Sequence, residues 1–188
     1  MMLLGVFFLI RTIFRFGDSK YEFRASSETV IKEIRALNRL ETAQFTIEKV
    51  IDAGTSGNRF QELLFGDRIL LIAHGNIIAG FDLSSMQDED VQVDGTTLRV
   101  TLPPPQILVT HLDPEQTRVY DRRTGVLSRG DKDLESEARK EAERILTEAA
   151  CTGNILEEAS NNARAQLTVL FKGMQFETVV FTIPEGSC

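Results

Sequence analysis

The stretch ILLIAHGNIIAGFDL, residues 69–83, is an almost continuous apolar run and decides the fold class of the chain. Two apolar segments flank residues 74–76 (HGN), and the turn pair at residues 66–67 (GD) precedes them. Short apolar runs punctuated by glycine are typical of antiparallel strands joined by tight turns. We therefore predict that the chain turns at residues 66–67 and again at residues 74–76, so that residues 69–83 form a hairpin.

Further short strands follow on the C-terminal side of this stretch. Residues 91–102 (VQVDGTTLRVTL) form the clearest hairpin, because the central Asp-Gly pair suits a type I′ turn. The three prolines at residues 103–105 must end the second strand, since proline has no N–H for a ladder. Residues 107–110 and 117–120 predict two more strands, which makes the middle of the chain β-rich and antiparallel.

A helix and a strand precede the stretch on its N-terminal side. Ser26 or Ser27 can cap a helix over residues 28–40. Its apolar face would consist of Val30, Ile34 and Leu37. Residues 41–52 then alternate with the period of two that predicts a half-buried strand. The inward residues of that strand would be Ala43, Phe45 and Ile47. A flexible loop is expected at residues 54–58, and residues 63–65 read as a short strand.

Beyond Gly130 the apolar spacing becomes that of helices. Residues 131–150 carry a narrow stripe of mainly small residues, Leu134, Ala138, Ala142, Ile145 and Ala149. Gly153-Asn154 breaks this helix, and a second helix over residues 155–172 stops at Gly173. Residues 174–183 alternate again and predict a closing strand. The fold class is therefore α+β, with a β-rich antiparallel middle followed by two C-terminal helices and a strand.

Length and composition exclude several kinds of protein. A chain of 188 residues fits one domain, or one domain with an appendage. Its net charge of −7 argues against a nucleic-acid partner. Two cysteines are too few for a disulfide-rich scaffold or a four-cysteine zinc site. We read Cys151 as a small buried apolar residue and Cys188 as a mobile terminal one.

The N-terminal segment predicts contact with a membrane. Residues 1–10 carry no charge, and Arg11 and Arg15 follow them. Ten residues reach only about 15 Å, whereas a spanning helix needs about 20 apolar residues. Three readings remain: a short or truncated anchor, an interfacial helix, or a buried N-terminal helix. The anchor is favoured, and a cleaved signal peptide fits poorly because no basic region or small-residue cleavage site flanks the run.

Charge divides the chain into an anchor, a neck and a body. Residues 1–40 hold seven basic and four acidic groups, a net charge of +3, so the remainder carries −10. We assign residues 1–16 to the anchor, residues 17–40 to a basic neck with its amphipathic helix, and residues 41–188 to the α+β body. The anchor and neck would contact anionic membrane lipid. Arg11 and Arg15 weakly favour a cytoplasmic body by the positive-inside rule.

Several short motifs together resemble a known family. They are residues 29–34 (TVIKEI) with 40–42 (LET), 79–84 (AGFDLS), 102–108 (LPPPQIL) and 119–121 (VYD). With the closing pair of alanine-bearing helices, they resemble the family known as domain of unknown function 4230, over residues 28–183. The resemblance implies a bacterial protein with one N-terminal membrane segment. It implies no activity, so it assigns no catalytic residue and no cofactor.

The only two histidines are the natural candidates for acid–base chemistry. His74 stands at the predicted turn, and a returning strand would bring Asp82 beside it. His111 and Asp113 fall on one side of their strand, but two ligands are fewer than a metal site needs. The acidic run at residues 88–90 lacks the spacing of a calcium loop and reads as solvated surface. We keep His74, Asp82 and His111 as catalytic candidates and expect no metal and no cofactor.

These observations favour a non-enzymatic interaction or accessory domain anchored to a membrane. Its partner would be another protein or a second copy of the chain. One alternative is a membrane-anchored enzyme that uses His74 and Asp82. Another is a self-assembling membrane scaffold, by loose analogy with stomatin and prohibitin domains. The absence of a nucleophile elbow and of a phosphate-binding loop leans against an enzyme.

Overall fold

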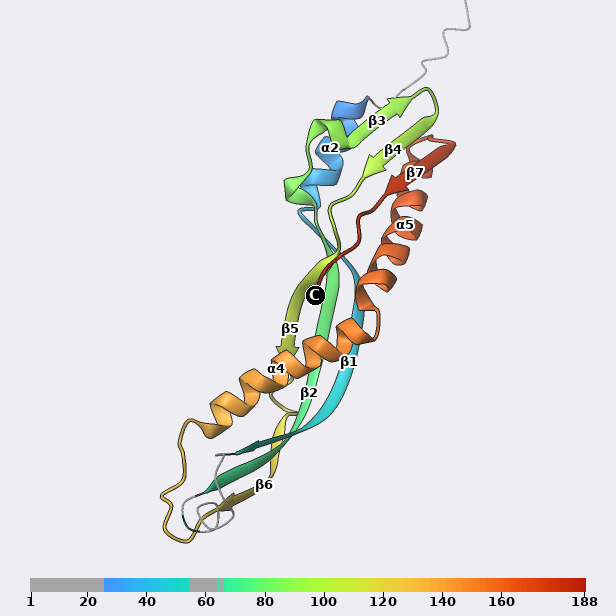
Figure 1. Ribbon diagram of the computed structural model, residues 1–188. Helices are drawn as coiled ribbons and strands as arrows, with labels where there is room; N and C mark the ends of the chain where they lie inside the picture. Colours follow the sequence, from blue (N-terminus) through green and yellow to red (C-terminus); the bar gives the residue numbers. More distant parts are fainter. Residues whose placement is uncertain (1–25, 55–63, 65) are drawn as a thin grey trace, which may run out of the picture.

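A long, twisted antiparallel sheet runs through most of an elongated molecule (Figure 1). The computed structural model describes residues 26–54, 64 and 66–188. The expected anchor at residues 1–16, most of the predicted loop at residues 54–58 and most of the predicted strand at residues 63–65 lie outside these residues. Across the described part of the chain, no helix combines the length and apolarity needed to cross a membrane.

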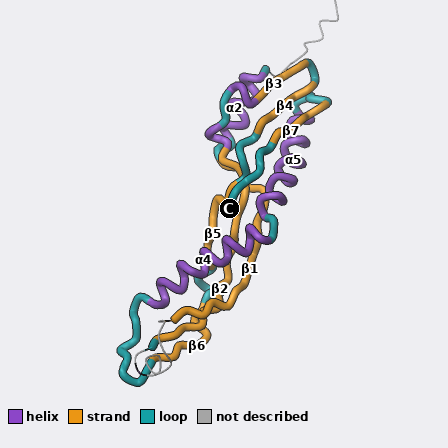
Figure 2. Tube along the Cα trace, viewed as in Figure 1, coloured by secondary structure: helices purple, strands orange, loops and turns teal. Residues whose placement is uncertain are grey.

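The main sheet contains β1 (Arg39–Gly54), β2 (Asp67–Asp82), β5 (Gln106–Leu112) and β6 (Arg118–Thr124). β1 pairs antiparallel with β2 along its whole length. β5 and β6 share the other edge of β2, β5 along residues 75–80 and β6 along residues 67–72. Figure 2 shows the two short strands following one another along this edge. β2 is therefore the central strand of the sheet.

The predicted hairpin at residues 69–83 is wrong, because β2 runs unbroken from Asp67 to Asp82. Alternate residues are buried through the whole stretch, including Gly75 in the middle of the predicted turn. A Cβ on Gly75 would lie 2.7 Å from Leu146 Cδ1, so this glycine allows a helix to approach the sheet closely. The predicted turn at residues 66–67 is wrong for the same reason, since Asp67 already belongs to the strand.

A smaller sheet lies at one end of the molecule. It is formed by β3 (Val91–Asp94), β4 (Thr97–Thr101) and β7 (Thr178–Thr182), in the order β3-β4-β7. The β3–β4 hairpin confirms the two strands predicted within residues 91–102. The predicted turn is wrong, because Asp94 pairs with Thr97 and the central residues are Gly95 and Thr96, of which only Gly95 has the positive φ that a type I′ turn needs at both positions. The closing strand is shorter than predicted and pairs parallel with β4. The two sheets confirm the α+β class.

In the described part of the chain, three helices cover the sheets: α2 (Ser27–Ala36), α4 (Leu134–Thr152) and α5 (Ile155–Gly173). Ser26 caps α2 by accepting from the Thr29 N–H, as predicted. Leu37, predicted to face the core, is 44% exposed because α2 ends before it. In α4 the buried stripe keeps a spacing of four throughout, so Leu146 and Ala150 replace the predicted Ile145 and Ala149.

Two hydrophobic cores result, and α5 contributes to both. The lower core packs α4 against the main sheet and includes Leu71, Ile77 and Leu146. The upper core joins α2 and the small sheet, and includes Ile34, Leu98 and Phe171. The first turns of α5 enter the lower core at Ile155 and Ala159, and its last turns enter the upper core at Leu167 and Phe171. β2 joins the same two cores, since Phe81 belongs to the upper one.

β1 and β2 approach each other very closely between the two cores, around Leu40, Thr42 and Gly80, and we call this region the waist. A Cβ on Gly80 of β2 would lie 1.9 Å from the Leu40 carbonyl oxygen of β1. At the neighbouring β-bulge of β1, the Thr42 hydroxyl donates to the Ala159 carbonyl at 2.8 Å. Asn162 Nδ2 donates back to the Thr42 carbonyl at 2.9 Å. These buried bonds fix α5 on the sheet at the waist.

A disulfide joins Cys151 of α4 to Cys188. The readings of Cys151 as an unpaired buried residue and of Cys188 as a mobile one are therefore wrong. Two cysteines 37 positions apart give no sign of pairing by themselves, because the fold between them brings them together. Closing a loop of this length stabilises the fold by about 4 kcal/mol through lost entropy of the unfolded chain. We call residues 183–188, which the bond secures, the strap.

Replacing Gly80 with alanine should destabilise the protein. The new Cβ would meet backbone atoms of β1, which cannot move aside without breaking the β1–β2 pairing. We expect a loss of at least about 2 kcal/mol in the free energy of unfolding, measured by chemical denaturation. Gly173→Ala is the control, since a Cβ there meets nothing within 4 Å. Equal stabilities for the two variants would contradict the close approach of β1 and β2 at Gly80.

Candidate functional site

Among the described residues, no helix covers one face of the main sheet. α4 and α5 both pack on the face that contains Leu71, Ile77 and Ala79. The opposite face, which we call the open face, carries the alternate residues of the four strands. Its apolar members are Val50, Leu70, Ile72, Ile78 and Val109. Its polar members include Thr46, Glu48, Asp52, Arg68, His74, Asn76, His111, Asp121 and Arg123.

The two histidines lie close together near the middle of the open face. In the sheet register His111 is directly opposite Asn76, two residues along β2 from His74. This places His74 and His111 as diagonal neighbours on two adjacent strands. His74 Nδ1 lies 3.9 Å from Glu48 Oε2, and the His74 side chain is 19% exposed. The pairing of β2 with β5, and not a hairpin, brings the histidines together.

Asp82 lies far from this pair. It ends β2, and eight residues of extended strand separate it from His74, or about 26 Å. Its carboxylate accepts from the Ser84 hydroxyl at 2.6 Å and from the Ser84 N–H at 3.1 Å. These bonds hold the pKa of Asp82 below its ordinary value and cap the short helix at Leu83–Ser85. We therefore base no catalytic proposal on His74 together with Asp82.

Asp113 is the carboxylate that the sequence places nearest to the histidines. Its N–H donates to the His74 carbonyl at 2.8 Å, so the chain leaves β5 beside His74. The carboxylate itself accepts from Gln116 Nε2 and from the N–H groups of Glu115 and Gln116. These hydrogen bonds from Gln116 and Glu115, with the nearby His74, lower the pKa of Asp113. Asp113 therefore shapes the turn after β5.

Two ion pairs frame the lower end of the open face. Arg68 donates to the two carboxylate oxygens of Asp52 from Nε and Nη2, and Arg123 Nε lies 3.0 Å from Asp121 Oδ2. The hydrogen bonds from Arg68 lower the pKa of Asp52. With Leu70 between them, the four charged side chains line a depression of about 230 Å³. The open face thus combines apolar residues with charges of both signs.

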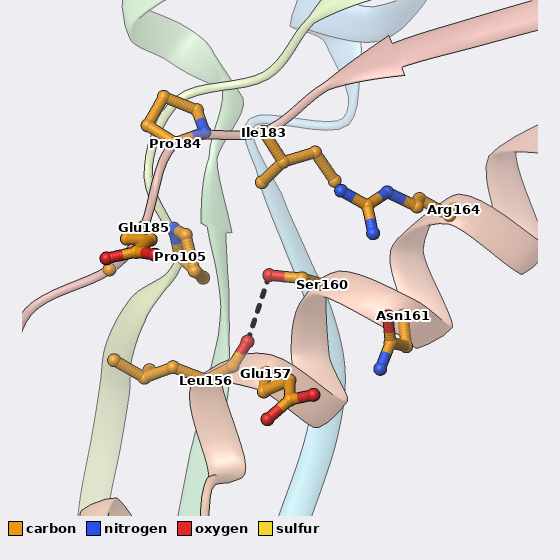
Figure 3. Close-up of a pocket in the computed structure, with 10 residues that line it drawn as sticks. Pro105, Leu156, Glu157, Ser160, Asn161, Arg164, Ile183, Pro184 and Glu185 are labelled. Atoms are coloured by element: carbon orange, nitrogen blue, oxygen red, sulfur yellow. Dashed lines mark hydrogen bonds between the residues drawn. The ribbon is translucent and has the colours of Figure 1, made fainter.

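A second cavity, of about 400 Å³, lies at the waist between α5 and the strap (Figure 3). Arg164 of α5 extends over it toward Ile183, and Glu157 and Glu185 lie on its walls. The Ser160 hydroxyl in the cavity already donates to the Leu156 carbonyl at 3.0 Å. Because its charges are of both signs and its hydroxyl is engaged, the cavity shows no selectivity for an anion or a cation.

No metal centre forms within the described residues, where no three His, Cys, Asp or Glu side chains meet with suitable geometry. In the acidic run at residues 88–90, Asp90 accepts from the Gln87 N–H and Asp88 pairs with Arg35. Both carboxylates therefore hold the local chain in place.

Asp67 is a buried carboxylate at a position where the sequence predicts a turn. Its side chain is 2% exposed and lies 2.6 Å from Arg122 Nη2. It also accepts from the Asp131 N–H at 2.7 Å, which ties β2 to β6 and to the segment before α4. These hydrogen bonds, led by that of Arg122, hold the pKa of Asp67 below its ordinary value. An acidic residue beside a glycine gives no local sign of such a role.

Comparison with known proteins identifies a family but no activity. The family described as "Protein of unknown function (DUF4230)" matches residues 32–181. No curated protein and no solved structure matches the chain. The match covers both sheets and all three helices apart from the first residues of α2 and the end of β7.

Replacing Asp67 with asparagine should lower stability in a pH-dependent way. The folded-state pKa lies below the ordinary value of 3.8, so the ionised carboxylate stabilises the fold above that pH. The stabilisation is lost as the pH falls below 3.8 and through the folded-state pKa. We expect a deficit of about 2–3 kcal/mol at pH 7, which shrinks in acid.

The measurement is chemical denaturation of both proteins between pH 7 and pH 2. Asp94→Asn is the control, because this residue is exposed at the end of β3, next to the turn at Gly95-Thr96. Its stability should match that of the wild type within about 0.5 kcal/mol. A deficit for Asp67→Asn that stays constant into acid would contradict the role of the ionised carboxylate.

Proposed function

The chain belongs to the family described as "Protein of unknown function (DUF4230)", which has no assigned activity, and we propose that it is a membrane-tethered, non-enzymatic interaction domain. Its open face would dock a protein partner. The observation that carries this proposal is the one-sided covering of the main sheet by α4 and α5.

The composition of the open face supports docking. An antiparallel sheet with one face in water normally alternates apolar-in and polar-out. Here apolar residues also occupy outward positions of β1, β2 and β5, and Val50 is 65% exposed. Contiguous exposed apolar residues surrounded by polar ones are typical of protein–protein interaction surfaces. The frame of exposed ion pairs would add selectivity for one partner over another.

The position of the open face suits a tethered protein. α2, which directly follows residues 1–25, lies at one end of the molecule, and β6 lies at the other (Figure 1). The open face belongs to the main sheet and so extends away from the α2 end. The tether itself rests on the uncharged run at residues 1–10 and the basic groups that follow it.

Placing an arginine in the open face should weaken partner binding. Val50→Arg adds a charge where the partner would bury an apolar side chain, while its exposure makes an effect on folding small. Val169→Arg is the matched control, because Val169 is 73% exposed on α5, which covers the other face. We expect Val50→Arg to lower affinity at least tenfold, or about 1.4 kcal/mol, and Val169→Arg to leave it unchanged.

The readout is the mass of the full-length protein particle extracted from its native membrane in mild detergent. The wild type should exceed one chain plus detergent, and Val50→Arg should approach a single chain. Integer multiples of the chain mass would identify the partner as a second copy. A single chain for the wild type, or dissociation by Val169→Arg alone, would contradict docking at the open face.

A charge within the N-terminal run should release the protein from the membrane. Phe8→Asp places an ionised carboxylate in the apolar run, at a cost of about 2.5–3.5 kcal/mol at the centre of a membrane helix. We expect the membrane-bound to soluble ratio to fall about 100-fold in fractionated cells. Val126→Asp is the control, since Val126 is 80% exposed in the body. An unchanged ratio for Phe8→Asp would contradict the tether.

A further inference from the structure

Two separate parts of the fold bring Cys151 and Cys188 together. Cys151 lies in the last turn of α4, next to the buried Ala150. Directly before the strap, the Leu102 N–H donates to the Thr182 carbonyl at 2.9 Å. At Gly186 the strap backbone lies against Pro105 so closely that a Cβ would come within 2.3 Å of the Pro105 carbonyl oxygen. The resulting Cα–Cα distance of 6.2 Å lies in the range that a disulfide spans.

The bond is accessible from solvent. Both cysteines line an open groove of about 650 Å³, together with Thr110 of β5 and polar residues of α4. Cys188 is exposed and Cys151 is half-buried. A second protein can therefore reach the sulfur of Cys188 without unfolding α4.

An exposed disulfide indicates the compartment in which a protein lies. Thiol pools of the cytoplasm keep accessible protein disulfides reduced, whereas such bonds form and persist outside it. These are the only cysteines of the chain, and no metal cluster in the described residues uses them. We propose that Cys151 and Cys188 are the substrate of a disulfide-carrying oxidoreductase, and that the body lies on the oxidising side of the membrane.

The oxidation balances as two exchange steps. The Cys188 thiolate attacks the disulfide of the oxidoreductase, forms a mixed disulfide and releases one thiolate of that enzyme. The Cys151 thiolate then attacks the Cys188 sulfur, which closes the bond and releases the second thiolate of the enzyme. The protein loses two electrons and two protons, and the enzyme disulfide becomes a dithiol.

This inference does not depend on a partner at the open face. It depends on the membrane tether only for the side on which the body lies. Arg11 and Arg15 weakly favour the cytoplasmic side, but we place the body on the oxidising side. A covalent bond that needs an oxidant distinguishes the two sides of a membrane more strongly than two flanking charges do.

The test uses the full-length protein in its native membrane. Cells are quenched in acid to stop thiol exchange, and free thiols are then alkylated with a maleimide that adds a large polymer. We expect no mass shift before reduction and a shift of two polymer units after it. Cys188→Ser should show one unit without reduction. Removing the thiol-oxidising enzymes of the host should leave two reactive thiols in the wild type.

A second measurement fixes the side of the membrane. Intact cells are treated with a membrane-impermeant maleimide after mild reduction, and labelling of both cysteines is expected. The control combines Cys151→Ser and Cys188→Ser with Lys132→Cys, an exposed position before α4 that should be labelled without reduction. Two reactive thiols before reduction in cells with intact oxidising enzymes, or a bond between two chains, would overturn the assignment of the disulfide. Protection of both cysteines and of Lys132→Cys in intact cells, with labelling after lysis, would overturn the oxidising side.

Discussion

The unbroken strand β2 is the constraint on which the rest of the structure depends. Its sixteen residues pair with β1 on one edge and with β5 and β6 on the other. Its inward side chains form the floor of the lower core, and Phe81 carries the same strand into the upper core. β1 and α5 also contribute to both cores, but β2 is the strand with which every other strand of the main sheet pairs. Gly75 and Gly80 permit the approach of a helix and of β1 to this strand without interrupting it.

The sequence predicts most of the elements but not how they join. Period and capping signals are local, so the start of α2, the strands of the β3–β4 hairpin, α4 and α5 are found close to their predicted positions. The end of α2 is wrong by four residues, because the helix ends at Ala36 and β1 begins at Arg39, within the helix predicted over residues 28–40. The error at residues 74–76 arose because glycine marks turns and close packing alike. His74 and Asn76 keep the outward phase of the strand. The glycine between them is explained by the close approach of Leu146, 71 residues away, and of the His111 carbonyl oxygen. The Cys151–Cys188 bond and the buried role of Asp67 also depend on contacts distant in sequence, over 37 and 55 residues.

For the candidate site, too, the sequence identifies residue types, and contacts distant in sequence decide which residues lie together. His74 and His111 were singled out by residue type, and the sheet register makes them neighbours. Asp82 was added through a hairpin that does not exist, and it serves as a cap. The open face could not be predicted, because the outward residues of a strand look alike whether or not a helix covers them. α4 and α5 pack on one face through buried residues such as Ala138, Ala142 and Ala159, and the described residues place no helix on the other face.

The parallel pairing of β4 with β7 sets the order in which the molecule can be completed during synthesis. Leu98 is paired with Val179, so the upper core lacks a strand until about 80 further residues have been made. At about 5–20 residues per second, the upper core of the nascent chain stays incomplete for roughly 4–16 s. Phe81, Leu98 and Val100, which are fully or almost fully buried in the finished protein, lack one side of their packing during that interval. The nascent region formed by α2, β3 and β4 therefore exposes apolar residues during synthesis, which is the situation in which chaperones protect a chain.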